Sequence, residues 1–303
     1  METITVTLKN GSKYELERGK PISEITRDLP QNPNLPFLCA QVNNEVRNID
    51  FRPEMDCTVE FLTYQTSEGR DAYRQSLAFV LARAILELYR NARLIIGHSI
   101  GNGFYYDLHT DVPVSDTILG YITEKMKTII EKNELFDKKT LTRTEAIATF
   151  KKEGYPEKAR LIQNLNADQV GVISCWKYLD IDHGPIVPST GFLKVWSLKQ
   201  YASGFVLLFP DQKNPAEPST IFDQPKIFSV YRESKEWGKI LEVNNVGRLN
   251  ACIQNGEISD FIKVAEALHE KKIGQIADEI TRRKDVRIVL IAGPSSSGKT
   301  TFS

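Results

Sequence analysis

The residues best suited to chemistry form a run of glycine, serine, lysine and threonine near the C-terminal end of the sequence. Gly293, Gly298, Lys299 and Thr300 match the phosphate-loop spacing G-x-x-x-x-G-K-[ST]. Glycines let the backbone turn tightly, so that its N–H groups can approach phosphate oxygens. The residues predicted to hold the phosphates of ATP are Gly293, Ser295, Ser296, Ser297, Gly298, Lys299, Thr300 and Thr301.

Two side chains of this loop are predicted to have separate roles. Lys299 would reach the β- and γ-phosphates as a point charge and is the predicted catalytic residue of a phosphoryl transfer. The hydroxyl of Thr300 would bind the Mg²⁺ that accompanies ATP. The alternative is a chance serine-glycine loop, which the complete match of all motif positions disfavours.

A phosphate loop needs a strand before it and a helix after it. The apolar, β-branched run Arg287–Ala292 predicts a buried parallel strand. The sequence ends three residues after Thr300, before a metal-holding aspartate or an acceptor site could follow. We therefore expect the front part of a longer phosphoryl-transfer enzyme, and we expect these 303 residues alone to lack kinase activity.

Composition narrows the class of protein. A length of 303 residues favours about two domains, and 41% hydrophobic with 26% charged residues is typical of a soluble globular protein. Basic and acidic residues balance at 39 each, so the overall charge does not indicate a nucleic-acid or membrane surface, and a local basic patch stays open. The four cysteines form no C-x-x-C pair, which predicts reduced thiols in a cytoplasmic protein. No signal peptide or apolar run of bilayer length appears, so we expect no membrane association.

The first 63 residues predict a small domain of strands around a short helix. Asn10-Gly11 is a hairpin signal, Asn43-Asn44 predicts a turn, and Ile22–Leu29 has helical spacing. This order of elements suggests a β-grasp. The strings Asn10-Gly11-Ser12 and Val42-Asn43-Asn44-Glu45 resemble the TGS domain of threonyl-tRNA synthetases. That resemblance implies a module that contacts a ligand or RNA, and leaves open a domain that only packs on its neighbour.

Residues 64–225 predict helices on one face of a largely antiparallel sheet, an α+β layer. Glu68–Tyr89 is amphipathic, and Ser115 is expected to cap a second helix. Further helices are expected at 143–153 and after Pro156, and strands are expected at Gly171–Tyr178, Gly191–Leu198 and Gly204–Phe209.

This second region resembles the editing-type domain of threonyl-tRNA synthetases. The matching residues are Gly69, Arg74, Ser76, Ala78, the string Asn102–Asp107, Gly184-Pro185, Val187-Pro188, Thr190-Gly191 and Lys194. The family's editing site uses an H-x-x-x-H pair and a C-x-x-x-H pair. Here these four degenerate editing-site positions hold Gln75, Phe79, Asp182 and Ile186.

The replacements remove the means of hydrolysis. Phe79 and Ile186 can neither bind a metal nor move a proton, so the resemblance implies a retained scaffold without its chemistry and without zinc. His98 and His183 fall in the matched region and could face the old pocket. Neighbouring residues on a strand point to opposite faces, so His183 should point away if Asp182 points inward.

The remainder of the chain predicts a strand at Phe228–Tyr231 and helices at Ser234–Val243, Ser259–His269 and Gln275–Arg283, the last two divided at Gly274. The predicted domains are 1–63 (TGS-like), 64–225 (editing-type), 226–285 (helical connection) and 286–303 (the first strand and phosphate loop of a truncated α/β kinase domain).

The combination of these parts, with Ala292–Thr301, resembles bacterial uridine kinase-like nucleoside kinases. That resemblance implies a full-length kinase that uses ATP and Mg²⁺ to phosphorylate uridine or cytidine, preceded by a regulatory or substrate-sensing region. The alternative is a nucleotide- or tRNA-binding module without catalysis of its own. A stand-alone editing hydrolase is disfavoured by the four replacements, and formation of an oligomer stays open.

Overall fold

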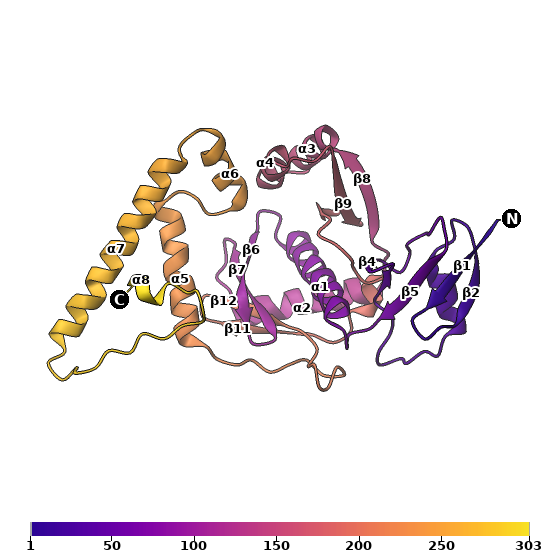
Figure 1. Ribbon diagram of the computed structural model, residues 1–303, viewed down its shortest axis with the longest axis horizontal. Coiled ribbons are helices and arrows are strands. Elements are labelled where there is room, and N and C mark those ends of the chain that lie inside the picture. The colour runs from indigo at the N-terminus through magenta and orange to yellow at the C-terminus, as the bar shows by residue number, and fades with distance from the viewer. Residues whose placement is uncertain (1, 303) are drawn as a thin grey trace. The chain divides into compact units, whose positions relative to one another are not determined.

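The computed structural model describes residues 2–302, of which residues 301 and 302 are described only by their backbone. The chain divides into two compact units. Figure 1 labels their helices and strands. The first unit comprises Met1–Thr142 and Asp168–Gln224, and the second comprises Arg143–Ala167 and Pro225–Ser303. The domain boundaries predicted at 63, 225 and 285 stay predictions.

The first unit begins with a five-stranded mixed sheet in the order β2-β1-β5-β3-β4. Its elements are β1 (Thr3–Leu8), β2 (Lys13–Glu17), the 3₁₀ helix η1 (Ile22–Asp28), β3 (Cys39–Val42), β4 (Glu45–Arg47) and β5 (Cys57–Leu62). The central strands β1 and β5 run parallel, and the other neighbours run antiparallel. Asn43 and Asn44 turn the chain between β3 and β4 with φ of 47° and 70°, the left-handed conformation that tight hairpins require.

The main core of the first unit lies between two helices and a four-stranded antiparallel sheet of order β11-β12-β7-β6. These elements are α1 (Ser67–Leu88), β6 (Arg93–Ile100), β7 (Gly103–His109), α2 (Asp116–Glu131), β11 (Ser197–Tyr201) and β12 (Gly204–Leu208). Both helices bury one face in this core, with Leu77 and Leu81 from α1 and Ile122 and Met126 from α2. The mixed α+β class is therefore confirmed.

Local capping explains where these helices begin. The predicted cap Ser115 accepts a hydrogen bond from the backbone N of Ile118 at 3.4 Å, and Thr66 caps α1 by accepting from the N of Gly69 at 3.1 Å. A Cβ atom at Gly69 would lie 2.0 Å from the carbonyl oxygen of Thr63, so only glycine fits this start of α1.

A second, three-stranded antiparallel sheet completes the first unit. It has the order β10-β9-β8, with β8 (Asp137–Thr142), β9 (Gln169–Cys175) and β10 (Tyr178–Ile181), and is followed by the 3₁₀ turn η2 (Thr190–Phe192). The predicted strand Gly171–Tyr178 is in fact the end of β9 and a hairpin turn into β10, and the strand predicted at Gly191–Leu198 begins only at Ser197.

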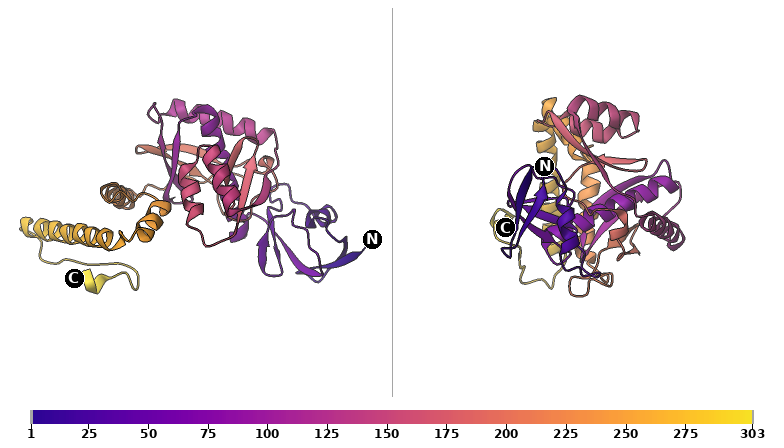
Figure 2. Two further views of the ribbon diagram at one scale, coloured as in Figure 1. Left: turned by 90° about the horizontal axis from the view of Figure 1, so that it is seen from above. Right: turned by 90° about the vertical axis from the view of Figure 1, so that its right-hand side faces the viewer.

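The second unit is helical. It contains α3 (Arg143–Lys152), α4 (Pro156–Gln163), α5 (Pro225–Ile240), α6 (Val246–Gln254), α7 (Ile258–Arg282) and α8 (Lys299–Phe302). The Nδ2 atom of Asn245, which caps α6, donates to the carboxylate of Glu157 in α4 at 3.1 Å. Figure 2 shows α7 as one unbroken helix. Among the described residues, no helix combines the length and apolar character needed to cross a membrane.

Three expectations for the second unit were wrong. Phe228–Tyr231 lies in α5, where Phe228 and Tyr231 share one helix face with ring centroids 6.0 Å apart. Gly274 does not divide α7, because strong helix formers surround it and the cost of one glycine is only about 1 kcal/mol. Arg287–Ala292 forms no strand: within the described residues no neighbouring strand pairs with its backbone, and Ile288 and Leu290 are 78% and 89% exposed.

Candidate functional site

The four degenerate editing-site positions come together between α1 and the segment that follows β10. Gln75 and Phe79 lie one turn apart on α1. The segment after β10 is held against this helix, because the backbone N of Val187 donates to the Oγ of Ser76 at 2.9 Å. A Cβ atom built at Gly184 would lie 3.9 Å from the Oε1 of Gln75, so the two elements approach closely at this point.

Aromatic and aliphatic packing occupies two of the four positions. The ring of Phe79 meets Phe136 and Tyr178 edge to face, with centroids 5.5 and 4.6 Å apart. Ile186 is only 2% exposed. Both side chains are therefore part of the core, and neither offers a group that could bind a metal or transfer a proton.

An ion pair occupies the third position. The Nζ of Lys138, in β8, lies 2.9 Å from the Oδ1 of Asp182 and donates to the carbonyl oxygen of Gly184 at 2.8 Å. The same Oδ1 accepts a hydrogen bond from the backbone N of Gly184 at 3.1 Å. The carboxylate of Asp182 is thus paired with an ammonium group, and its Oδ1 accepts from two donors.

Asn48 ties this ion pair to the N-terminal sheet region. Its Oδ1 accepts from the backbone N of Ile186 at 3.0 Å and from the Nζ of Lys138 at 3.4 Å. Sequence analysis missed both Lys138 and Asn48. Nothing local marks them, since Lys138 stands 44 residues from Asp182 and Asn48 stands 138 residues from Ile186.

The two histidines of the matched region, His98 and His183, lie in different surroundings. His183 is exposed and belongs to no hydrogen bond with the four positions that the structure shows. His98 lies in β6, with its ring 6.3 Å from that of Tyr105, and burial lowers its pKa below the usual value. Within the part of the chain that the structure describes, no three His, Cys, Asp or Glu side chains gather as a metal-binding group. The absence of zinc stays a prediction.

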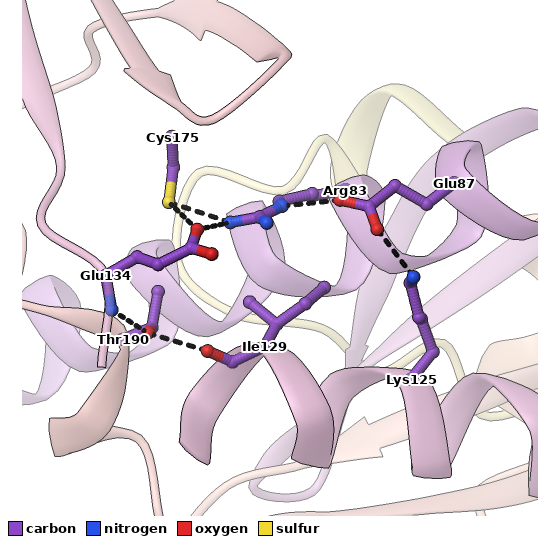
Figure 3. A network of polar contacts seen from close by, with 7 residues as sticks. All are labelled: Arg83, Glu87, Lys125, Ile129, Glu134, Cys175 and Thr190. Atoms are coloured by element: carbon purple, nitrogen blue, oxygen red, sulfur yellow. Dashed lines mark hydrogen bonds and ion pairs between the residues drawn. The ribbon is translucent and has the colours of Figure 1, made fainter. Parts of the chain in front are cut away.

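A network of ion pairs surrounds Arg83, a buried residue of α1, the helix that also contains Gln75 and Phe79 (Figure 3). Arg83 is 2% exposed, and its guanidinium pairs with Glu134 and, through Nε at 2.7 Å, with Glu87. Lys125 of α2 joins Glu87 at 2.6 Å, and the Sγ of Cys175 lies 2.9 Å from the guanidinium. The network links α1 to α2, to the chain before β8 and to the end of β9.

Charges in this network shift one another's pKa. The hydrogen bond from Arg83 holds the pKa of Glu134 below its usual range. Burial works against ionisation of Glu87, but Lys125 and Arg83 prevail and lower its pKa. Burial raises the pKa of the Cys175 thiol to about 11, so this cysteine is not a reactive thiolate at neutral pH. The contacts of this network therefore hold neighbouring elements together through paired charges.

The phosphate-loop residues form a closed turn in the second unit. Ser296 and Gly298 take the left-handed φ values of 58° and 77°, and α8 begins at Lys299. The Nζ of Lys299 donates to the carbonyl oxygens of Gly293 at 3.0 Å and Pro294 at 2.6 Å. A Cβ atom at Gly293 would lie 2.7 Å from the Oγ of Ser297, so the hydroxyl of Ser297 would have to move for a larger residue to fit. The predicted contact through the side chain of Thr301 lies outside the described residues.

Comparison with known proteins shows similarity to one class of enzyme. No protein-family profile matches the chain. It is 37% identical over 205 residues to the threonine–tRNA ligase of Acetivibrio thermocellus, which is 67% of this chain and 32% of that protein. The corresponding ligases of Desulforamulus reducens and a Janthinobacterium species are 36% and 35% identical over the same shares. The chain therefore spans about a third of the length of these relatives.

These relatives correct the prediction of enzyme class. The expectation that the full-length protein is a uridine- or cytidine-phosphorylating kinase is wrong, because the similar proteins are ligases that act on threonine and tRNA. The physical reason is that a phosphate loop specifies a polyphosphate and carries no information about the acceptor.

Proposed function

We propose that the first unit is a binding module for tRNA that does not hydrolyse the ester of an aminoacyl-tRNA. Support comes from the similarity to threonine–tRNA ligases and from the α+β scaffold that carries the matched strings. The observation that carries the proposal is the Lys138–Asp182 ion pair beside the Phe79 aromatic cluster. These contacts stand where a hydrolytic site needs free donors and acceptors.

The proposed module would bind tRNA through a complementary surface but would lack the groups that hydrolyse an ester. Binding requires a complementary surface, whereas ester hydrolysis also requires a base or a metal-bound water positioned at the carbonyl. Phe79 and Ile186 supply neither, and the carboxylate of Asp182 already has two donors. A cytoplasmic location belongs to this proposal and is supported by four buried, free cysteines.

Titration of fluorescently labelled, deacylated tRNA with the protein tests this function. We expect saturable binding whose affinity falls as salt rises, because basic side chains displace counterions from phosphates. A DNA duplex of similar length serves as the competitor and should displace the tRNA poorly. Absence of binding, or equal displacement by the duplex, would contradict a tRNA-binding module.

A second candidate function is nucleotide binding by the loop Gly293–Thr301 of the second unit. It is favoured by the closed turn, in which the Nζ of Lys299 donates to the carbonyl oxygens of Gly293 and Pro294. Lys299 and the backbone N–H groups of residues 295–298 would hold the phosphates of ATP, and Thr300 would bind the accompanying Mg²⁺. In this arrangement the positive charge of Lys299 would offset part of the negative charge of the phosphates.

Calorimetric titration with Mg²⁺-ATP tests this second site. Lys299→Ala removes a charge-assisted hydrogen bond and should weaken binding roughly 10- to 100-fold. Lys284→Ala is the matched control, since this exposed lysine lies outside the loop and should leave the affinity unchanged. Equal affinities for the wild type and Lys299→Ala would show that ATP does not bind at the loop.

A further inference from the structure

An exposed tryptophan occupies an unfavourable backbone position at the β9–β10 hairpin. Cys175 pairs with Tyr178, so the connection consists of only Trp176 and Lys177. Trp176 takes a φ of 55°, in the left-handed region that glycine or asparagine adopts readily and a bulky residue avoids. A glycine or asparagine here would make the turn at lower conformational cost, so the indole must contribute something that the turn itself does not need.

Arg83 of the ion network contacts one face of this indole. The guanidinium carbon of Arg83 lies over the ring, 5.5 Å from its centroid, and Arg83 itself is 2% exposed. Glu87 and Glu134 hold that guanidinium in place. Trp176 therefore covers the network, and the fixed cation below it fixes the plane of the ring.

The remainder of the ring is open to solvent. Trp176 is 62% exposed, although it contacts a fully buried cation. The Nζ of the exposed Lys177 lies 4.8 Å from the ring centroid. A large, rigidly held aromatic surface beside a flexible cation is the arrangement on which a nucleic-acid base stacks while its phosphate meets the ammonium group.

We propose that Trp176 is a stacking platform for an unpaired base of single-stranded RNA, with Lys177 contacting the adjoining phosphate. This inference rests on the proposed binding of tRNA by the first unit and assigns it a contact residue. Preorganisation by Arg83 reduces the entropy lost on binding, because the ring needs no reorientation to receive a base. Stacking of this kind tolerates any base, since every base presents a π-face.

A labelled, single-stranded oligoadenylate is the probe for this site, with fluorescence anisotropy as the readout. Trp176→Ala should weaken its binding about 5- to 100-fold, and Trp176→Phe should retain most of the affinity because an aromatic ring remains. Tyr121→Ala is the matched control: Tyr121 is also exposed, at 58%, and belongs to α2 rather than to this hairpin. Binding should also quench tryptophan emission in the wild type, and Trp176→Phe should lose that quenching.

The outcomes separate this inference from the function on which it rests. If the wild type binds tRNA but Trp176→Ala binds oligoadenylate as tightly as the wild type, the platform is refuted and the tRNA-binding module stands. Failure of the wild type to bind oligoadenylate would refute the platform too. Binding of oligoadenylate that depends on Trp176, without any binding of tRNA, would support the platform and refute the tRNA-binding module. Thermal unfolding of each variant confirms that the compared proteins are folded.

Discussion

At the scale of residues, two buried or half-buried ion pairs decide what the first unit can do. The Lys138–Asp182 pair holds the one carboxylate among the four degenerate editing-site positions, and the Arg83 network fixes α1 against its neighbours. Such groups are costly to remove singly, because the partner is left as an uncompensated charge away from water. The Arg83 network therefore yields a prediction in which the loss of one side chain costs more free energy of unfolding than its contacts contribute.

Replacement of Arg83 by methionine should lower the free energy of unfolding by about 3–5 kcal/mol, because the half-buried carboxylates of Glu134 and Glu87 both lose this partner. Urea unfolding measures the change. Lys127→Met is the control, since its pair with Glu124 lies on the surface of α2 and contributes at most about 0.5 kcal/mol. Equal losses in the two variants would show that the Arg83 network does not stabilise the fold.

The same network predicts how stability depends on pH. The pKa values of Glu134 and Glu87 are lowered in the folded protein, so their stabilisation is complete above the ordinary glutamate pKa of about 4.3. It is lost as the pH falls below that value and through the folded-state pKa. Arg83→Met should flatten this acid-side loss, since Glu134 then titrates nearer its ordinary pKa. An unchanged pH profile would contradict this account of the network.

Sequence reasoning identified the replaced residues but not their partners. Gln75, Phe79, Asp182 and Ile186 follow from motif spacing, which is local. Lys138 and Arg83 were missed, because Asp182 lies 44 residues from Lys138 and Glu134 lies 51 residues from Arg83. Glu87 is only four residues from Arg83, but that spacing does not indicate burial. Only the fold places such charges side by side.

At the scale of elements, a glycine in the middle of α7 offers a clean test of helix propensity. Gly274 has no atom within 4 Å of a built Cβ, so Gly274→Ala should raise the free energy of unfolding by about 0.5–1 kcal/mol. Gly154→Ala is the matched control: its surroundings are equally open, but its φ of 83° is left-handed. Alanine there should destabilise by about 1 kcal/mol. Thermal unfolding measures both changes in stability. If both variants were stabilised, or both destabilised, the backbone conformations given for the two glycines would be wrong.

Helices, caps and turns with strong local sequence signals were predicted correctly. Strands were predicted less well, because a strand forms only when another strand pairs with its backbone. The periodicity of α1, the Ser115 cap and the Asn43-Asn44 turn all appear in the structure. The turn at Trp176-Lys177 was missed because neither residue favours a turn. Arg287–Ala292 looked like a strand from its side chains, but a strand needs a partner for its backbone, which a single apolar run cannot reveal.

At the scale of the whole molecule, the chain combines a mixed α+β first unit with a helical second unit that contains the G-x-x-x-x-G-K-[ST] motif at 293–300. The α+β class followed from the order of predicted elements, whereas the division into compact units did not. Residues 143–167 group with the distant C-terminal helices rather than with their sequence neighbours. Sequence order alone contains no signal for that grouping.

The proposal that the first unit binds tRNA without hydrolysing the aminoacyl ester is tested most directly by the hydrolysis rate of seryl- and threonyl-tRNA with saturating protein. The account predicts that the ester is bound and decays at its spontaneous rate, because Phe79 and Ile186 carry no reactive group and Asp182 is paired with Lys138. Asp182→Asn should leave that rate unchanged. Hydrolysis accelerated by the wild type and abolished in Asp182→Asn would contradict the claim and show an active site at this position.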